Sequence, residues 1–497
     1  MLQTCKDLFL RWNENVSYCH WKSNEHLIQG LNGETDLDVF VLPSDKENAE
    51  NALLTCGYIK FLPQKGCRYP NVDEWIGFDY ETGKLVHVHL HYQIITGTKF
   101  VKEYVFPLDE EVISSRILDI NTGVYIMHPE LEAIILFCRI ALKANNKNNI
   151  KPSNDSQREI DYVKKRIKVD SLLELCNRII GTLEGSEICQ IISMDKPKKE
   201  DWYIIYRIAE KWLSPYRKHS KIVSKVKHFY NKARLGYMSI YNKKFDGCYV
   251  TRKTLSPRGI SICFIGADGS GKSSVTQDLT KWLTWKINAK RFYLGSGDGY
   301  NSVYKRVLSQ LRRKGSSSNT KQRHVNNSEG NNCTNTLMAQ IGILLLSREY
   351  MRVAKRALKQ VRNVFQYSRN GSIAMLDRFP QIQFAGIYDG PKIESLAVRK
   401  GGVSMISQFL AKKEFKLLMK AQLYQPDLVF RLLLPAEESM RRKPFEDRLS
   451  VERKSQITSK LEFEKSIVYD IDATQDYQTE LLSIKRIIWK HLLQNLS

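Results

Sequence analysis

Residues 260–283 read ISICFIGADGSGKSSVTQDLTKWL, and they decide the fold of the C-terminal half of the chain. An apolar run, a glycine-rich turn and a helix-like stretch follow one another, which is the setting in which the pattern GxxxxGK[ST] forms a phosphate-binding loop. Glycines let such a loop turn tightly, so that backbone N–H groups and the positive end of the next helix face phosphate oxygens. The stretch therefore predicts an α/β fold with a P-loop parallel sheet flanked by helices.

The loop also supplies most of the candidate ligand-binding residues. Lys272 is expected to bridge the β- and γ-phosphates of ATP, and the hydroxyl of Ser273 is expected to ligate Mg²⁺. The predicted ATP-binding residues are Gly266, Asp268, Gly269, Ser270, Gly271, Lys272, Ser273 and Ser274. The predicted cofactors are accordingly ATP and Mg²⁺.

A second candidate group ends the strand predicted over 372–376. Asp377 and Arg378 follow this strand directly, and ligands bind at the carboxyl edge of a parallel sheet. Asp377 is expected to hold Mg²⁺ through water, and Arg378 is expected to clamp a phosphate. A simple salt bridge between such residues is the structural alternative.

A third candidate group follows the strand predicted over 428–434. A helix beginning near Ala436 delivers Arg441, Arg442 and Lys443, with Arg448 shortly after it. Cationic side chains there can close over phosphates, so Arg441, Arg442 and Arg448 are candidate lid residues. The alternative is a solvated basic helix end, which the helix dipole favours. The candidate catalytic residues are Lys272, Asp377, Arg378 and Arg442.

Together these pieces resemble the thymidylate kinase family. The loop GADGSGKSS, the stretch PDLVFRLLLPAEESMRRKPFEDR (426–448) and the ending IDATQDYQTELLSIKRIIW (471–489) are similar to that family's phosphate loop, arginine-rich lid and last strand and helix. The resemblance covers roughly residues 259–493. It implies transfer of the γ-phosphoryl group of ATP, with Mg²⁺, to a phosphorylated small-molecule acceptor such as thymidine monophosphate, and it suggests a homodimer.

The acceptor motifs depart from that family. Where the family has Arg-Glu-Pro-Gly, this chain has LGSGDG at 294–299, and Asp377-Arg378 continues as Phe-Pro without the family's serine and tyrosine. These features look like divergent thymidylate-kinase-like proteins with an extra N-terminal domain, some of which serve surface-polysaccharide biosynthesis. The acceptor is therefore a nucleotide or a sugar or glycan intermediate, and a nucleotide-gated regulatory protein is a third interpretation. A further family arginine corresponds to Arg348, Arg352 or Arg356.

The N-terminal half carries a different candidate site. HWKSNEHLIQGLNGETDLDVFV (20–41) resembles the nucleotidyltransferase fold, in which a small-residue turn, here at Ser23, precedes a strand carrying Asp-x-Asp, here Asp36 and Asp38. The resemblance implies that the two carboxylates share metal ions such as Mg²⁺. A relic surface turn is the alternative. Lys22 occupies a place where such transferases usually carry Gly.

Histidines replace the third carboxylate that the nucleotidyltransferase family needs. The strand LVHVHLHY (85–92) alternates with a period of two, which puts His87, His89 and His91 on one face. Imidazole suits Zn²⁺, Mn²⁺ or Fe²⁺ better than Mg²⁺. The site is expected either to be inactive or to use another metal, and packed or hydrogen-bonded histidines are the alternative.

The pattern divides the chain into three parts. We expect a nucleotidyltransferase-like mixed α/β domain over 1–126, a helical subdomain and linker over 127–252, and the thymidylate kinase-like P-loop domain over 253–497. Within the last, residues 312–336 are rich in Ser, Asn, Lys and Gly and are expected to form a flexible insertion.

Composition narrows the class of protein. The 497 residues are 42% hydrophobic and 26% charged, as in ordinary globular proteins of several domains. Ten cysteines without a CxxC pair exclude a zinc ribbon. The chain has no apolar run of the roughly 20 residues that cross a bilayer and no signal-peptide core, so no membrane span and a cytoplasmic location are expected. The net charge of +24 comes without a nucleic-acid-binding signature, so nucleic acid is not an expected partner.

Overall fold

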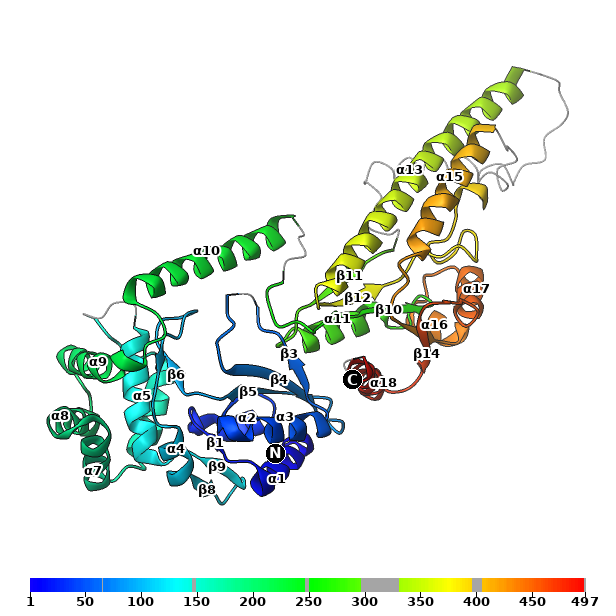
Figure 1. Ribbon diagram of the computed structural model, residues 1–497. Helices are drawn as coiled ribbons and strands as arrows, with labels where there is room; N and C mark the ends of the chain where they lie inside the picture. The colour runs from blue at the N-terminus through cyan, green and yellow to red at the C-terminus, as the bar shows by residue number, and fades with distance from the viewer. Residues whose placement is uncertain (65, 145–148, 246–249, 296–329, 396–404, 496–497) are drawn as a thin grey trace. The chain divides into compact units, whose positions relative to one another are not determined.

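The computed structural model describes residues 1–497 except 65, 145–148, 246–249, 296–329, 396–404 and 496–497, which Figure 1 draws in grey. The chain forms two compact units. Unit 1 comprises Met1–Ser256 together with Leu482–Ser497, and unit 2 comprises Pro257–Leu481. The last helix, α18 (Tyr477–Gln494), therefore begins in unit 2 and ends in unit 1.

A parallel sheet of five strands forms the centre of unit 2. The strands are β10 (Ser261–Gly266), β11 (Ala289–Tyr293), β12 (Ile373–Asp377), β13 (Leu428–Leu433) and β14 (Ile467–Asp472), in the order β11-β12-β10-β13-β14. All neighbouring pairs are parallel. Phe264 stacks on Phe430 of the next strand with ring centroids 5.1 Å apart, and every residue of β10 is buried. Strands covered on both faces are apolar along their whole length, as β10 is.

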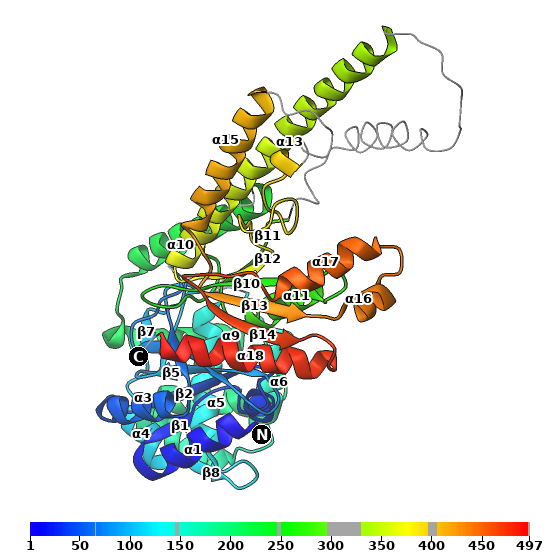
Figure 2. The same ribbon diagram turned by 90° about the vertical axis from the view of Figure 1, so that its right-hand side faces the viewer.

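Helices connect these strands and carry the side chains of the carboxyl edge. They are α11 (Lys272–Leu283), α13 (Gly330–Arg369), α15 (Met405–Gln422), α16 (Ala436–Arg442) and α17 (Arg448–Thr458). Figures 1 and 2 show α13 and α15 running side by side, while α16 and α17 follow β13 as a separate helical pair. Because all five strands run the same way, the loops after β10 and β12 meet at one edge of the sheet.

Unit 1 is built on a mixed sheet of seven strands in the order β3-β4-β5-β2-β1-β9-β8. The strands are β1 (Tyr18–His20), β2 (Asp36–Val41), β3 (Ile59–Phe61), β4 (Val72–Phe78), β5 (Leu85–His91), β8 (Ile117–Asp119) and β9 (Val124–Ile126), and β6 (Ile95–Thr96) pairs separately with β7 (Tyr104–Val105). The central strands β2 and β5 are parallel, whereas β4 runs antiparallel to β5.

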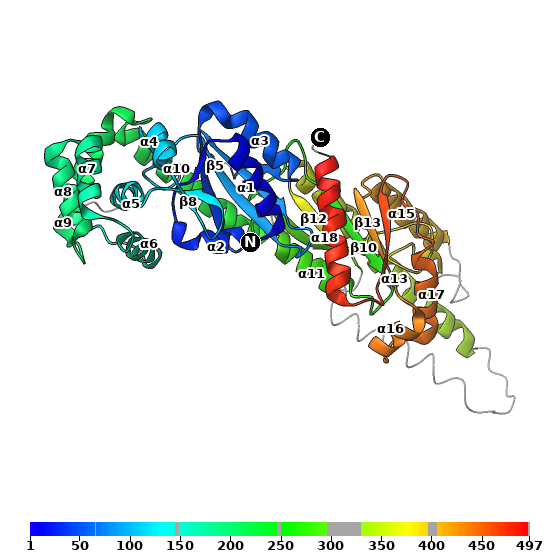
Figure 3. The same ribbon diagram turned by 90° about the horizontal axis from the view of Figure 1, so that it is seen from below.

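Helices of unit 1 cover the sheet and form a bundle beside it. Those near the sheet are α1 (Gln3–Asn15), α2 (Leu27–Leu31), α3 (Lys46–Thr55) and α4 (Asp109–Ser115). Figure 3 shows α6 (Asn154–Lys164), α7 (Val169–Ile180), α8 (Thr182–Ser193) and α9 (Lys199–Leu213) gathered around α5 (Pro129–Lys143), which is buried along most of its length. The long helix α10 (Lys221–Phe245) follows this bundle.

The end of α18 completes the core of unit 1. Trp489 is fully buried, donates its indole N–H to the carbonyl of Gly57 at 3.0 Å and stacks on Phe78 with ring centroids 5.7 Å apart. A segment from the far end of the sequence thus packs against the first sheet.

The strands that the sequence predicts at both sites are present. Those expected over 37–42, 85–92, 260–265, 372–376 and 428–434 differ from the observed strands by at most one residue at each end. Residues 312–329 of the expected insertion lie outside the described residues, and 330–336 begin α13. Within the described chain, every helix is too short or too polar to cross a bilayer.

Candidate functional site

The loop between β10 and α11 has the backbone of an anion cradle. Gly269 and Gly271 both have φ of 84°, in the left-handed region that favours glycine. A Cβ on Gly266 would lie 2.9 Å from the carbonyl oxygen of Leu432, which is too close for any side chain. The glycines of this loop are therefore required by its geometry, and α11 begins directly after them at Lys272.

Lys272 lies folded over the loop. Its ammonium donates to the carbonyl of Ala267 at 2.6 Å and to the hydroxyl of Ser270 at 3.4 Å, and the residue is only 7% exposed. Burial and the neighbouring charge of Arg378 lower the pKa of Lys272 to about 8. A buried cation in this position gains an anionic partner when phosphate binds between the loop and the side chain.

Ser273 and Asp377 meet at the edge between β10 and β12. The Ser273 hydroxyl donates to Oδ2 of Asp377 at 2.8 Å, and Arg291 on β11 pairs with the same carboxylate. Asp377 is 1% exposed, and its Oδ1 has no hydrogen-bond partner among the residues described. A hydroxyl beside a buried carboxylate oxygen without a partner fits the oxygen ligands that Mg²⁺ takes.

Arg378 adopts an unusual backbone conformation next to this pair. Its φ is 75°, which is rare for a residue with a side chain and recurs at ligand-binding sites. Its guanidinium lies 3.4 Å from Asp268 of the loop and 3.8 Å from Asp389. Arg378 therefore points along the carboxyl edge, and its contacts are long enough to be exchanged for a phosphate.

The three candidate lid arginines separate into one that reaches the loop and two that do not. Arg442 donates to the carbonyl of Gly269 at 3.4 Å and to that of Ala473 at 3.0 Å. Arg441 pairs with Glu438 on its own helix, and Arg448 pairs with Glu452. Arg441 and Arg448 are each 77% exposed, so in this conformation only Arg442 of the three lies over the phosphate loop.

Two residues of this site escaped the sequence-based prediction. Lys454 of α17 forms an ion pair with Asp268, and Arg291 pairs with Asp377. The position of Lys454 depends on how α17 packs behind the loop, which no local motif encodes. Arg291 lies on a strand whose alternation places it opposite Met375 in β12, two residues before Asp377.

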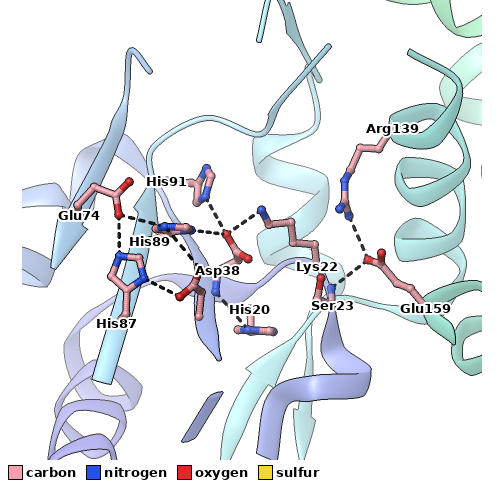
Figure 4. Close-up of polar contacts among 11 residues, drawn as sticks. His20, Lys22, Ser23, Asp38, Glu74, His87, His89, His91, Arg139 and Glu159 are labelled. Carbon is pink, nitrogen blue, oxygen red and sulfur yellow. Dashed lines mark hydrogen bonds and ion pairs between the residues drawn. The ribbon is translucent and has the colours of Figure 1, made fainter. Parts of the chain in front are cut away.

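The second candidate site lies on the central strands of unit 1, and Figure 4 shows its side chains converging. The parallel register places Asp36 opposite His87 and Asp38 opposite His89. His87 Nδ1 lies 2.7 Å from Asp36, and His89 Nδ1 lies 3.1 Å from Asp38. His91 Nε2 reaches Asp38 at 3.3 Å. The predicted carboxylates and the three histidines thus form one cluster.

A third carboxylate, which the sequence-based interpretation held to be missing, is present in this cluster. Glu74 of β4 stands opposite His89 in the antiparallel register and lies 2.7 Å from His87 Nε2 and 3.0 Å from His89 Nε2. The expectation failed because it looked for the acid on the histidine strand. Lys22 lies 2.7 Å from Asp38, so an ammonium already balances that carboxylate.

Charges decide the protonation of the histidine cluster. Burial alone would lower the pKa of His89, but Glu74 and Asp38 raise it to about 9. Burial lowers the pKa of His91 to about 4 and also lowers that of His87. Without a bound ion, the imidazolium of His89 is therefore the cation that the carboxylates hold.

Cations also gather on the side of this cluster that faces α5. Burial and the charges of Lys22 and Arg139 lower the pKa of Lys102 to about 7, and Arg139 is the main cause of a lowered pKa at Lys143. Arg139 is itself held by Glu159 at 3.1 Å. Like charges this close are stabilised by a bound anion.

Comparison with known proteins gives relatives for less than half of the chain. No protein-family model matches. The Escherichia coli (strain K12) protein named “Uncharacterized ATP-binding protein YghR” is 29% identical over 233 residues, which are 46% of this chain and 86% of that protein. The one named “Uncharacterized ATP-binding protein YghS” is 26% identical over 216 residues, 42% of this chain and 84% of that protein. Among solved structures, deoxyadenosine kinase from M. mycoides with bound dATP matches 46% of this chain and 99% of its own, with 13% identity and a TM-score of 0.29.

Proposed function

We propose that unit 2 is an ATP-dependent kinase that transfers the γ-phosphoryl group to a phosphorylated acceptor, with thymidine monophosphate as the first candidate. The observation that carries this proposal is the meeting of Lys272, the Ser273–Asp377 pair and Arg442 around one glycine-rich loop. The relatives' names, which specify ATP binding, support the nucleotide.

Each group at the edge has a role in this reaction. Backbone N–H groups of the loop and the start of α11 receive the phosphates, and Lys272 leaves the Ala267 carbonyl to pair with them. Ser273 and Asp377 would hold Mg²⁺, which neutralises charge on the phosphates when it is bound. The bond between Pγ and the bridging oxygen breaks as an acceptor oxygen bonds to Pγ, and Arg442 balances charge on the transferred group.

The acceptor is expected on the side of Arg378 away from the loop. A small crevice there is lined by residues of α13, α15 and the segment after β12, including Tyr350, Pro380, Lys392 and Glu414. Lys392 and Arg378 both approach Asp389, at 3.9 and 3.8 Å. Two cations sharing one carboxylate can accept a phosphate dianion, which favours a phosphorylated acceptor.

The direct test is release of ADP from ATP and Mg²⁺ by the full chain with different acceptors. Stimulation by thymidine monophosphate supports a nucleotide kinase. Stimulation by phosphorylated sugars or glycan intermediates alone would redirect the proposal to surface-polysaccharide chemistry. Tight ATP binding without any acceptor-stimulated turnover would instead favour a nucleotide-gated regulatory protein.

For unit 1 we propose a transition-metal site made by Asp36, Glu74, His87 and His89, in a fold of nucleotidyltransferase type. One ligand atom from each of Asp36, His87 and His89 lies within 4.8 Å of the others, and Glu74 lies 3.0 Å from His89. Ligands of a tetrahedral zinc site lie about 2.0–2.2 Å from the ion, hence roughly 3.4 Å apart. Because Lys22 occupies the second carboxylate, Asp38, the ion is expected on the Asp36 side.

Metal content after loading tests this second proposal. The full chain is incubated with Zn²⁺ or Mn²⁺, desalted, and its bound metal measured in excess Mg²⁺. We expect about one ion per chain, lost in His89→Asn and retained in the control His128→Asn, since His128 lies outside the cluster. Retention of the ion by His89→Asn, or its displacement by Mg²⁺, would contradict the assignment.

A further inference from the structure

The helix α10 presents three different faces along its 25 residues. One face packs on unit 1: Ser224 is buried, His228 donates to the carbonyl of Lys99 at 2.8 Å, and Asn231 donates to that of Phe100 at 3.3 Å. These three residues are separated by four and three positions, the spacing of one helical face. The packed face fixes which side of α10 turns outward.

The opposite face is apolar and exposed. Ile222, Val226 and Phe229 follow one another at helical spacing, and Ile240 lies five turns after Ile222 on the same line. Ile222 is 76% exposed and Phe229 73% exposed, and Tyr230 stands beside them. Single exposed apolar residues are ordinary on protein surfaces, but an apolar stripe along a whole helix marks an interaction surface.

Basic residues border this stripe on both sides. At 100° per residue, Lys221, Lys225 and Lys232 fall along one flank, and Lys227 and Arg234 along the other. The sequence has no Asp or Glu between Glu210 and Asp246, so the helix carries only positive charge. An apolar centre between two cationic borders is the arrangement of helices that lie in the surface of a membrane.

We propose that α10 docks the protein on an anionic lipid bilayer, with the helix axis parallel to the membrane surface. The apolar stripe would enter the boundary between headgroups and acyl chains, and the lysines would extend sideways to lipid phosphates. A bilayer offers both an apolar layer and an anionic rim, whereas nucleic acid offers the charge without such a layer. The length of about 37 Å is suited to lying along the surface.

Vesicle sedimentation of the full chain tests this docking. We expect binding to vesicles of phosphatidylcholine mixed with phosphatidylglycerol, and at least tenfold weaker binding to phosphatidylcholine alone. Each basic residue near an anionic surface contributes roughly a factor of five, so Lys225→Gln with Lys232→Gln should weaken binding about 25-fold. Higher salt should have a similar effect.

A stripe variant separates docking from charge attraction alone. Ile222→Ser with Phe229→Ser alters two exposed side chains, so the fold is expected to persist, and binding to anionic vesicles should fall at least tenfold. The matched control is Leu183→Ser with Lys196→Gln, an exposed apolar residue and an exposed cation elsewhere in unit 1, which should bind as the parent does.

Three outcomes would overturn the proposal. They are equal binding to both kinds of vesicle, unchanged binding of the stripe variant, and absence of vesicle binding. In the last case, a stripe variant that lowers the mass of the protein in solution would show that a second copy covers the stripe.

Discussion

Replacing Asp377 with Asn should remove activity while leaving unit 2 folded. The substitution keeps the shape of a side chain that is 1% exposed but removes the charge that would face Mg²⁺. It weakens the pair with Arg291, which is worth about 1.5–3 kcal/mol for a charged hydrogen bond, and relieves the burial of a carboxylate oxygen that has no hydrogen-bond partner among the residues described. These terms oppose each other, so we expect the free energy of unfolding to change by less than about 2 kcal/mol.

The catalytic effect of Asp377→Asn is expected to be much larger. Removing one preorganised electrostatic contact to a transition state costs about 10²–10³ in kcat, or about 2.7–4 kcal/mol. The assay is the initial rate of ADP release at saturating ATP over a series of Mg²⁺ concentrations, together with urea unfolding of both proteins. Raising Mg²⁺ should recover part of the loss, because the variant binds the ion more weakly.

The matched control is Asp427→Asn at the opposite edge of the same sheet. Asp427 accepts from the backbone N–H of Ser261 at 2.7 Å and from its hydroxyl at 2.8 Å, where β10 begins. Its replacement should cost about 1–2 kcal/mol of unfolding free energy and leave kcat unchanged. A rate for Asp377→Asn within about threefold of the parent, at equal Mg²⁺, would refute the assigned role.

Three other outcomes follow from contacts in the structure. Arg442→Ala should lower kcat by about 10²-fold, whereas Arg441→Ala, which removes an exposed side chain, should leave ADP release nearly unchanged; equal losses would contradict the distinction. The pKa of Lys272 is lowered from 10.5 to about 8, so the unfolded chain binds more protons between these values and the free energy of unfolding should rise with pH over this range, by up to about 3 kcal/mol; urea unfolding should show no such rise in Lys272→Met. Trp489→Ala should destabilise unit 1 by about 3–5 kcal/mol, seen as a lower Tm, and an unchanged Tm would show that the end of α18 is not part of that core.

The sequence predicts the phosphate loop well because its information is local. The glycines, Lys272 and Ser273 lie within eight residues, and their spacing alone defines the turn and the start of α11. Asp377 was also predictable, since a polar residue ending a buried strand lies at the carboxyl edge of a parallel sheet. The same reasoning located Asp36 and Asp38 on a central strand.

Contacts that depend on packing between distant segments were not predictable from these patterns. Arg441 and Arg442 are neighbours in sequence, yet one helical position of 100° sends only Arg442 over the loop. Lys454 reaches Asp268 only because α17 packs behind the loop. Glu74 had a usable signal, because a hairpin joining the strands on either side of the turn ETGK places it opposite the histidine strand.

The measurement that tests the central claim most directly is acceptor-stimulated ADP release by the parent and by Lys272→Ala, with circular dichroism to compare their folds. If unit 2 is a kinase, the parent should release ADP from ATP and Mg²⁺ in the presence of thymidine monophosphate, and the variant should lose at least about 10²-fold in kcat with its fold retained. Equal rates for the two folded proteins would contradict a phosphotransferase built on this loop.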